Sequence, residues 1–147
     1  MKLSILGALI LTTSFAFADG HLGDAPASLV AVNDAFNQRA AASDATGLVD
    51  LYAKDTLWIA QGAPLSQGLA GPRQLFEFVT ANAGSVTHTI DHLFVSKDET
   101  LAVMIGSVKA VVEAAEMDAT GTYLFVLEPQ DDGWEIVTDM WHQHVAQ

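Results

Sequence analysis

The first half of the chain has apolar residues every three to four positions, which is the period of an amphipathic helix. We expect a first helix from Pro26 and a second over residues 45–53, with Asp44 as its N-cap. A third helix over residues 72–83 would open with Pro72 and be capped at Gly84. The first helix would turn these residues inward: Leu29, Val32, Phe36 and Ala40.

The apolar period falls to two in the second half of the chain, which predicts β-strands. Long strands are expected over residues 86–96, 101–115, 117–128 and 134–145, with shorter ones earlier, over 56–60 and 65–68. Gly106 lies inside the second long strand, where a glycine indicates a bulge or a sharp bend. Helices followed by a long antiparallel meander describe an α+β domain.

Residues 1–18 have the features of a secretory signal peptide. Lys2 supplies a positive charge, a short apolar run follows it, and Ala16-Phe17-Ala18 offers a small-x-small cleavage site. We expect cleavage after Ala18, a flexible leader over residues 19–26 and one domain over residues 27–147. The sequence contains no Cys, so the exported chain would be stable without disulfides, which fits a bacterial periplasmic or secreted protein.

The chain is acidic, with 6 basic residues against 18 acidic ones and a formal net charge of −12 when His is neutral. Nucleic acid and anionic lipid are therefore poor partners, because binding to phosphate depends on Lys and Arg. No second apolar stretch is long enough for stable membrane insertion after signal cleavage. The sequence also lacks a phosphate-binding Gly-rich loop followed by Lys, a Gly-x-Ser-x-Gly motif and a His-Glu-x-x-His motif, so we expect no cofactor.

Five short motifs follow one another along the chain. They are Leu51-Tyr-Ala-Lys-Asp-Thr56, Gly68-x-x-Gly-Pro-Arg-Gln-Leu-Phe-Glu-Phe78, Val95-Ser-Lys-Asp-Glu-Thr-Leu-Ala102, Gly121-Thr-Tyr-Leu-Phe-Val-Leu127 and Asp132-Gly-Trp-Glu-Ile-Val-Thr-Asp-Met-Trp141. In this order and at this spacing they resemble the nuclear transport factor 2-like superfamily, and its SnoaL-like branch most closely, over residues 29–143.

That resemblance implies a cystatin-like fold, in which a strongly curved, mainly antiparallel sheet wraps around the N-terminal helices. The concave face of the sheet would form a conical pocket, and the convex face would form a homodimer. The fold hosts isomerases, cyclases, dehydratases, ligand carriers and assembly domains, so it does not by itself specify an activity.

The last expected strand carries the main candidate site. Successive strand residues point to opposite faces, so Val137, Asp139 and Trp141 share one face. In ligand-binding relatives a Trp at the position of Trp141 looks into the pocket, which implies that Asp139 does so too. A carboxyl group on an apolar wall has a raised pKa and can act as a general base or bind a cationic ligand. The structural alternative is an Asp held by a hydrogen bond from a neighbour.

Aromatic residues elsewhere would complete an apolar pocket for a small, flat or ring-shaped ligand, with core packing as the alternative role of each. The resemblance places these residues in its lining: Phe36, Trp58, Ala60, Phe78 and Tyr123. Ketosteroid isomerase resembles this chain in layout but uses a Tyr on the first helix and an Asp on the first strand. The matching positions here are Phe36 and Ala60, so steroid isomerisation by that mechanism is not expected.

Histidines form a second set of candidates. His88 and His92 are four residues apart on one expected strand and would share a face, from which either could serve the pocket as an acid–base group. His142 and His144 share the other face of the last strand, where they could chelate a metal with a third ligand or make polar contacts at an interface. We expect no metal.

Three functions remain open from the sequence. The first is an exported protein that binds a small apolar or aromatic molecule. The second is a cofactor-independent isomerase, cyclase or hydrolase of SnoaL-like type, with Asp139 or a pocket His as general base. The third is a homodimeric assembly module whose cavity is incidental.

Overall fold

The computed structural model describes residues 26–131 and 133–144, so the expected signal peptide and nearly all of the leader lie outside the described residues. Within that part of the chain the helices are α1 (Ala27–Ala41), α2 (Ala45–Val49) and α3 (Ala70–Ala81). The strands are β1 (Tyr52–Ile59), β2 (Ser66–Gln67), β3 (Ser85–His88), β4 (His92–Val95), β5 (Ala102–Val112), β6 (Met117–Gln130) and β7 (Gly133–Gln143), with a 3-10 turn at Glu113–Ala115. Among the described helices we find none with the length and apolar character to span a membrane.

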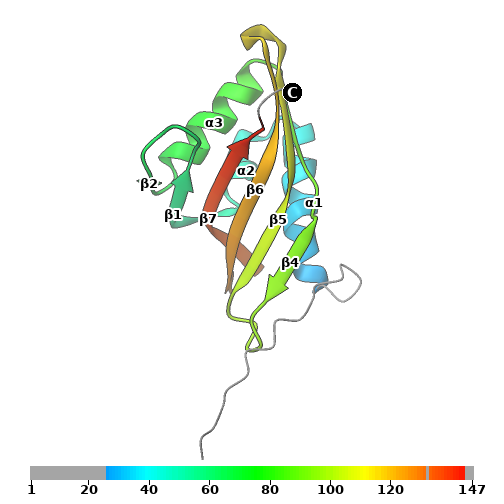
Figure 1. The fold of residues 1–147 in the computed structure, drawn as a ribbon, viewed down its shortest axis with the longest axis vertical. Coiled ribbons are helices and arrows are strands. Elements are labelled where there is room, and N and C mark those ends of the chain that lie inside the picture. Colours follow the sequence, from blue (N-terminus) through cyan, green and yellow to red (C-terminus); the bar gives the residue numbers. More distant parts are fainter. Residues whose placement is uncertain (1–25, 132, 145–147) are drawn as a thin grey trace, which may run out of the picture.

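The strands form one 7-stranded sheet in the order β2-β1-β7-β6-β5-β3, with β4 also paired to β5. The pairing of β1 with β7 is parallel, and the other pairings in the described sheet are antiparallel. In Figure 1 the sheet faces the viewer, and α1 and α2 lie behind it. The predicted α+β class and the curved, mainly antiparallel sheet are confirmed.

Helix α1 buries the predicted stripe against the sheet. Leu29 and Phe36 are almost completely buried, and each such side chain contributes roughly 1.5–3 kcal/mol through the apolar surface that it removes from water. At the next helix, Asp44 is the N-cap, as predicted, because its Oδ1 accepts a hydrogen bond of 2.8 Å from the backbone N–H of Gly47. A Cβ on Gly47 would lie 2.1 Å from the Asp44 carboxylate, so a side chain there would displace the carboxylate from its present position.

The second helix is shorter than the prediction of residues 45–53. It ends at Val49, and Tyr52 already belongs to β1. Pairing with the last strand causes this change, because Tyr52 lies opposite Ile136 and the Ile136 N–H donates to the Leu51 carbonyl oxygen at 2.9 Å. Tertiary hydrogen bonds therefore override a helical spacing that is genuine in the sequence.

Helix α3 begins at Ala70, two residues before the predicted start. Its C-terminus forms a Schellman motif, in which the Gly84 N–H donates to the Val79 carbonyl oxygen at 2.8 Å. Ala83, with φ of 51°, takes the left-handed position that the sequence assigned to glycine. Gly84 has a different role, because a Cβ there would lie 2.6 Å from a methyl group of Val112 on β5.

The expected strand over residues 86–96 is divided into β3 and β4 by a bulge. His88 pairs with Val108 and His92 pairs with Ile105, so three residues oppose two. The extra residue reverses the inward and outward positions, so that His88 is buried and His92 is exposed. Gly106 permits the bulge because a Cβ there would lie 1.7 Å from the Thr89 carbonyl oxygen. The bulge predicted at Gly106 lies instead in the segment opposite it, between β3 and β4, because β5 pairs with β6 without a break. The prediction that both histidines share a face is wrong.

A second bulge lies in β7. Leu127 pairs with Ile136 and the neighbouring Val126 pairs with Thr138, which leaves Val137 as the extra residue. As a result, Ile136 and Asp139 are both buried although their positions differ in parity. The inward face of β7 is therefore not the simple alternation that the sequence predicted.

Candidate functional site

A cavity of about 70 Å³ lies between the inner face of the sheet and the helices α1 and α3. Its walls are mainly aromatic, and the rings come from five elements: Phe36, Tyr52, Trp58, Phe76, Tyr123 and Trp141. An engineered apolar cavity of about 150 Å³ binds benzene, so this space suits a group of a few heavy atoms. A fused-ring ligand would require the walls to move.

Asp139 is the acidic residue of this cavity and is only 5% exposed. Its Oδ2 accepts a hydrogen bond of 2.7 Å from the Tyr52 hydroxyl. Burial raises the pKa of the Asp139 carboxyl to about 7, and the hydrogen bond from Tyr52 opposes that rise. The pKa of Tyr52 is also raised, by burial and by the neighbouring carboxyl, so its hydroxyl stays neutral and donates. At neutral pH the carboxyl can therefore both release and accept a proton.

The parallel pairing of β1 and β7 creates this Tyr–Asp pair. Trp58 lies opposite Asp139 in the β1–β7 register, and Phe125 lies opposite Asp139 on the β6 side. The Tyr52 ring contacts Trp58, Phe76 and Phe125, with centroid separations of 6.3, 5.9 and 6.4 Å. The carboxyl group is therefore surrounded by aromatic rings.

His88 is a further titratable group of the cavity wall. Its imidazole is stacked between Phe36, at 4.0 Å and 15°, and Tyr123, at 4.3 Å and 14°. Burial lowers the pKa of His88 to about 3, so the ring is neutral at physiological pH. Its Nδ1 is buried and has no hydrogen-bond partner among the described residues.

The side-chain amide of Asn37 holds His88 in place. Its Nδ2 donates to the His88 carbonyl oxygen at 2.9 Å, and its Oδ1 accepts from the His88 N–H at 2.8 Å. This pairing satisfies the backbone of the edge strand β3 from the side opposite β5. Consecutive residues of α1 thus hold one imidazole, since Phe36 stacks on the ring and Asn37 binds the backbone.

Tyr123 completes the stack by reaching across the bulge. Its hydroxyl donates to the Thr89 carbonyl oxygen at 2.9 Å, and its ring lies over Gly106, where a Cβ would be 2.9 Å from the ring edge. Burial raises the pKa of Tyr123, so it also remains neutral. The bulge therefore fixes the position of the Tyr123 ring in the site, and the ring fits there because Gly106 has no side chain.

The structure brings together most of the residues that the sequence singled out. The cavity is lined by Phe36, Trp58, His88, Tyr123, Asp139 and Trp141. Their roles in binding or catalysis stay predictions, because placement in a wall does not establish a contact with a ligand.

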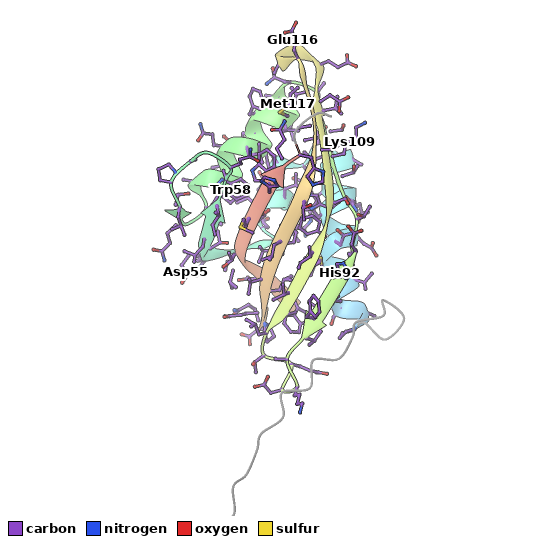
Figure 2. All side chains as sticks on the ribbon, viewed as in Figure 1. Asp55, Trp58, His92, Lys109, Glu116 and Met117 are labelled. Carbon is purple, nitrogen blue, oxygen red and sulfur yellow. The ribbon has the colours of Figure 1, made fainter. Side chains whose placement is uncertain are left out.

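Four predicted residues lie outside the cavity lining. Phe78 is 42% exposed on the outer side of α3, because Phe76 and Val79 take the inward positions of that helix. Val137 is displaced by the bulge in β7, and the bulge after β3 exposes His92 (Figure 2). Ala60 follows the end of β1 and packs against the core instead.

Tyr52 is a polar site residue that sequence reasoning missed, as it missed Phe76 in the lining. The helix predicted over residues 45–53 included Tyr52, whereas Tyr52 opens β1 and donates to Asp139. Tyr favours strands and lies shortly before the strand expected over residues 56–60, but its helical spacing from Leu48 obscured this signal.

His142 and His144 lie on the outer face, where the His144 ring contacts the Thr122 hydroxyl at 2.9 Å. No cluster of metal-ligating side chains occurs among the described residues.

Comparison with known proteins gives the family. The SnoaL-like domain matches residues 29–145. Among similar solved structures, a nuclear transport factor 2-like protein of unknown function from Shewanella oneidensis has 16% identity and a TM-score of 0.66, covering 78% of this chain and 96% of its own. A ketosteroid isomerase-like protein from Erwinia carotovora atroseptica has 17% identity and a TM-score of 0.61, with coverage of 82% and 93%.

A nuclear transport factor 2-like protein with a cystatin-like fold from Novosphingobium aromaticivorans has 12% identity and a TM-score of 0.67, with 82% of each chain covered. Likeness at these identities shows the fold alone. No curated protein matches the sequence. The fold includes isomerases and dehydratases. On the family match over most of its length, the chain belongs to the SnoaL-like domain family, with a nuclear transport factor 2-like fold.

Proposed function

We propose that the protein binds a small, largely apolar molecule in the aromatic cavity and orients it through Asp139. The observation that carries this proposal is a buried carboxyl group with one side-chain partner, Tyr52, in a wall that is otherwise almost wholly apolar. Binding sites of this kind combine apolar walls with a few polar groups that fix orientation. Asp139 also lines the cavity, so a bound molecule would lie beside its carboxyl group.

Trp58 and Trp141 both line the cavity, so their fluorescence reports its occupancy. Native mass spectrometry of protein from its source would reveal a retained ligand, and a fluorescence titration would then give its affinity. We expect Asp139→Asn to change the affinity for that ligand and Asp55→Asn to leave it unchanged, since Asp55 is exposed on β1 (Figure 2). Unchanged affinity in Asp139→Asn would contradict the orienting role.

A second candidate function is acid–base catalysis on the bound molecule. The observation that favours it is the pKa of about 7 for Asp139, since a general base works best with a pKa near the operating pH. Asp139 would take a proton from an activated C–H or from water, and Tyr52 would hold the carboxyl in position. If Asp139→Asn abolishes turnover of the retained ligand but preserves its affinity, catalysis is supported. If the ligand is never converted, simple binding is the better description.

We also propose that two copies of the chain pair through the outer face of the sheet. That face carries two cross-strand rows of partly exposed apolar side chains: Ile59, Met140, Leu124 and Ile105 in one, and Leu57, Val126, Val103 and Phe94 in the other, where Thr138 lies between Leu57 and Val126. Unpartnered apolar surface of this kind is typical of an interface. Light scattering should report a dimer, and Leu124→Lys should shift it toward the monomer.

Export to the periplasm or medium is likewise our proposal, supported by the charge, apolar run and small-x-small site of residues 1–18. Intact mass measurement of the protein from its source should give a chain that begins at Asp19. An uncleaved chain retained in the cytoplasm would contradict it.

A further inference from the structure

The cavity carries a group that can become negative and none that is positive. Asp139 is its acidic residue, and no Lys or Arg of the described residues lines it. His88 is neutral at physiological pH, because burial lowers its pKa to about 3. A buried carboxylate without a cationic partner is costly, so a cation bound beside Asp139 would stabilise the ionised form of this carboxyl group.

The walls of the cavity favour the same sign of charge. The faces of Trp, Tyr and Phe rings carry negative electrostatic potential and attract cations within about 6 Å of the ring centre. Trp58, Trp141, Tyr52 and Phe76 are among the rings that surround the space. An anionic ligand would meet ring faces and a carboxyl group, and would find no positive side chain to offset its own desolvation.

The lining offers few hydrogen-bond acceptors, chiefly the Asp139 carboxylate and His88, whose Nδ1 has no partner among the described residues, and this narrows the kind of cation. A primary ammonium group has three N–H donors, and each one left unpaired in an apolar wall costs free energy. Tertiary and quaternary methylammonium groups have one N–H donor or none and cover the charge with methyl groups that pack against rings. The cavity volume of about 70 Å³ suits such a head group better than a fused ring system.

We propose that the ligand of this site is a small organic cation bearing a tertiary or quaternary methylammonium group, held between the aromatic faces and the Asp139 carboxylate. The inference rests on the proposed function, because it names the class of molecule that the cavity binds. The net charge of −12 adds to the attraction, since it raises the concentration of cations near the protein.

Occupancy should depend on pH through Asp139. The titratable groups that face it are Tyr52 from β1, His88 from β3 and Tyr123 from β6, while α1 and α3 contribute only uncharged side chains to the cavity. The pKa values of both tyrosines are raised and that of His88 is lowered, so all of these groups stay neutral from mildly acidic to mildly basic pH. A bound cation favours ionised Asp139, so affinity should rise as pH increases through about 7.

The test is a titration of the purified, untagged protein with tetramethylammonium and with tert-butanol, a neutral compound of similar shape, followed by Trp fluorescence. Near pH 8 we expect tetramethylammonium to bind at least about tenfold more tightly than tert-butanol. That preference should shrink near pH 5.5 and in Asp139→Asn, and it should persist in Asp55→Asn. Tetramethylammonium does not titrate, so any pH dependence belongs to the protein.

Trp141→Leu provides a second variant that leaves the carboxyl in place. It keeps an apolar wall but removes one aromatic face, so tetramethylammonium should lose more affinity than tert-butanol does. Equal binding of both compounds at each pH would overturn the cation inference and leave a neutral-ligand cavity in place. If neither compound, nor phenol as an aromatic probe, changes the Trp signal, the cavity binds no small molecule and the proposed function fails as well.

Discussion

The two faces of the β5–β6–β7 sheet are both rich in apolar residues, yet they treat polar groups differently. On the inner face Asp139 and His88 are buried. Burial raises the pKa of Asp139 and lowers the pKa of His88, so that it favours the neutral form of each group. On the outer face the Lys109 Nζ lies 3.8 Å from the Asp118 Oδ1, and both side chains of this ion pair are exposed to solvent. The sheet thus buries titratable groups on its inner face and leaves an ion pair exposed to solvent on its outer face.

The comparison shows that position relative to the sheet, more than residue type, sets the chemistry. Leu124 and Leu127 belong to one strand, and His88 and His92 are four residues apart, yet each pair divides between the two faces. Experiments that exploit such pairs can therefore separate the effect of the face from the effect of the residue.

The largest expected effect comes from the two leucines of β6. Leu127→Ala removes a fully buried side chain and should lower the free energy of unfolding by about 2–5 kcal/mol, because it loses transfer free energy and leaves a cavity. Leu124→Ala, on the half-buried outer side, should cost about 1 kcal/mol or less in the monomer. Urea unfolding at low protein concentration measures both, and equal losses would mean that the outer face is covered within the monomer.

The pH dependence of stability should come next in size. Folding raises the pKa of Asp139 from its ordinary 3.8 to about 7, so between these values the folded state holds a proton that the unfolded chain has released. Rising pH therefore favours unfolding by at most about 1.4 kcal/mol for each pH unit in that window. His88 acts in the opposite direction, because its folded pKa of about 3 lies below the ordinary 6.5 and stability is lost as pH falls through that range.

The Asp139 contribution can be isolated with a variant of the same shape. The difference in unfolding free energy between the wild type and Asp139→Asn should fall as pH rises from about 4 to 7, since His88 is common to both proteins. A difference that stays flat with pH would show that the Asp139 carboxyl is not desolvated in the folded state.

A smaller effect is expected from the bulge that separates the faces of His88 and His92. Gly106→Ala would place a Cβ 1.7 Å from the Thr89 carbonyl oxygen, so the bulge or the Tyr123 ring must shift, at about 1–3 kcal/mol. Gly62→Ala serves as control, because Gly62 has φ of 74° but open space around it, and should cost about 1 kcal/mol from backbone strain alone. Denaturant unfolding ranks the two, and a smaller cost at Gly106 would contradict the role given to its missing side chain.

The bulges also explain how far the sequence could predict the site. Gly106 indicated an irregularity in the sheet, but a glycine does not indicate which of two paired strands carries the extra residue. The opposite orientations of His88 and His92 therefore could not be predicted. The bulge at Val137 has no glycine or proline beside it and is fixed by pairing with β6. Aromatic residues such as Phe36 and Trp141 were placed correctly in the lining because their elements are regular between the bulges.

Tyr52 illustrates the remaining limit. Its helical spacing from Leu48 is genuine, but the strand it joins is completed by β7, far along the chain. Local pattern cannot weigh a hydrogen-bonded pairing with a distant segment against a helical turn. The fold class, which depends on the broad change of period from helical to extended, needed no such information and was predicted.

The smallest effect in this series distinguishes two asparagines one turn apart on α1. Asn37 makes two hydrogen bonds to the backbone of His88, so Asn37→Ala should leave a strand N–H and C=O without partners and cost about 1–2 kcal/mol. Asn33 is buried as well, but its Oδ1 finds no partner among the described residues, so Asn33→Ala should cost less or even stabilise the fold.

Unfolding alone would not show that Asn37 fixes the inner face of the sheet, since any buried residue affects stability. The specific readout is the His88 ring, whose NMR signals are shifted by stacking on Phe36 and Tyr123. Asn37→Ala should move those signals toward the values of an unstacked imidazole, and Asn33→Ala should not. If Asn37→Ala leaves the His88 signals unchanged, aromatic stacking suffices to orient the imidazole, and the inner face owes its order to packing instead of to this pair of hydrogen bonds.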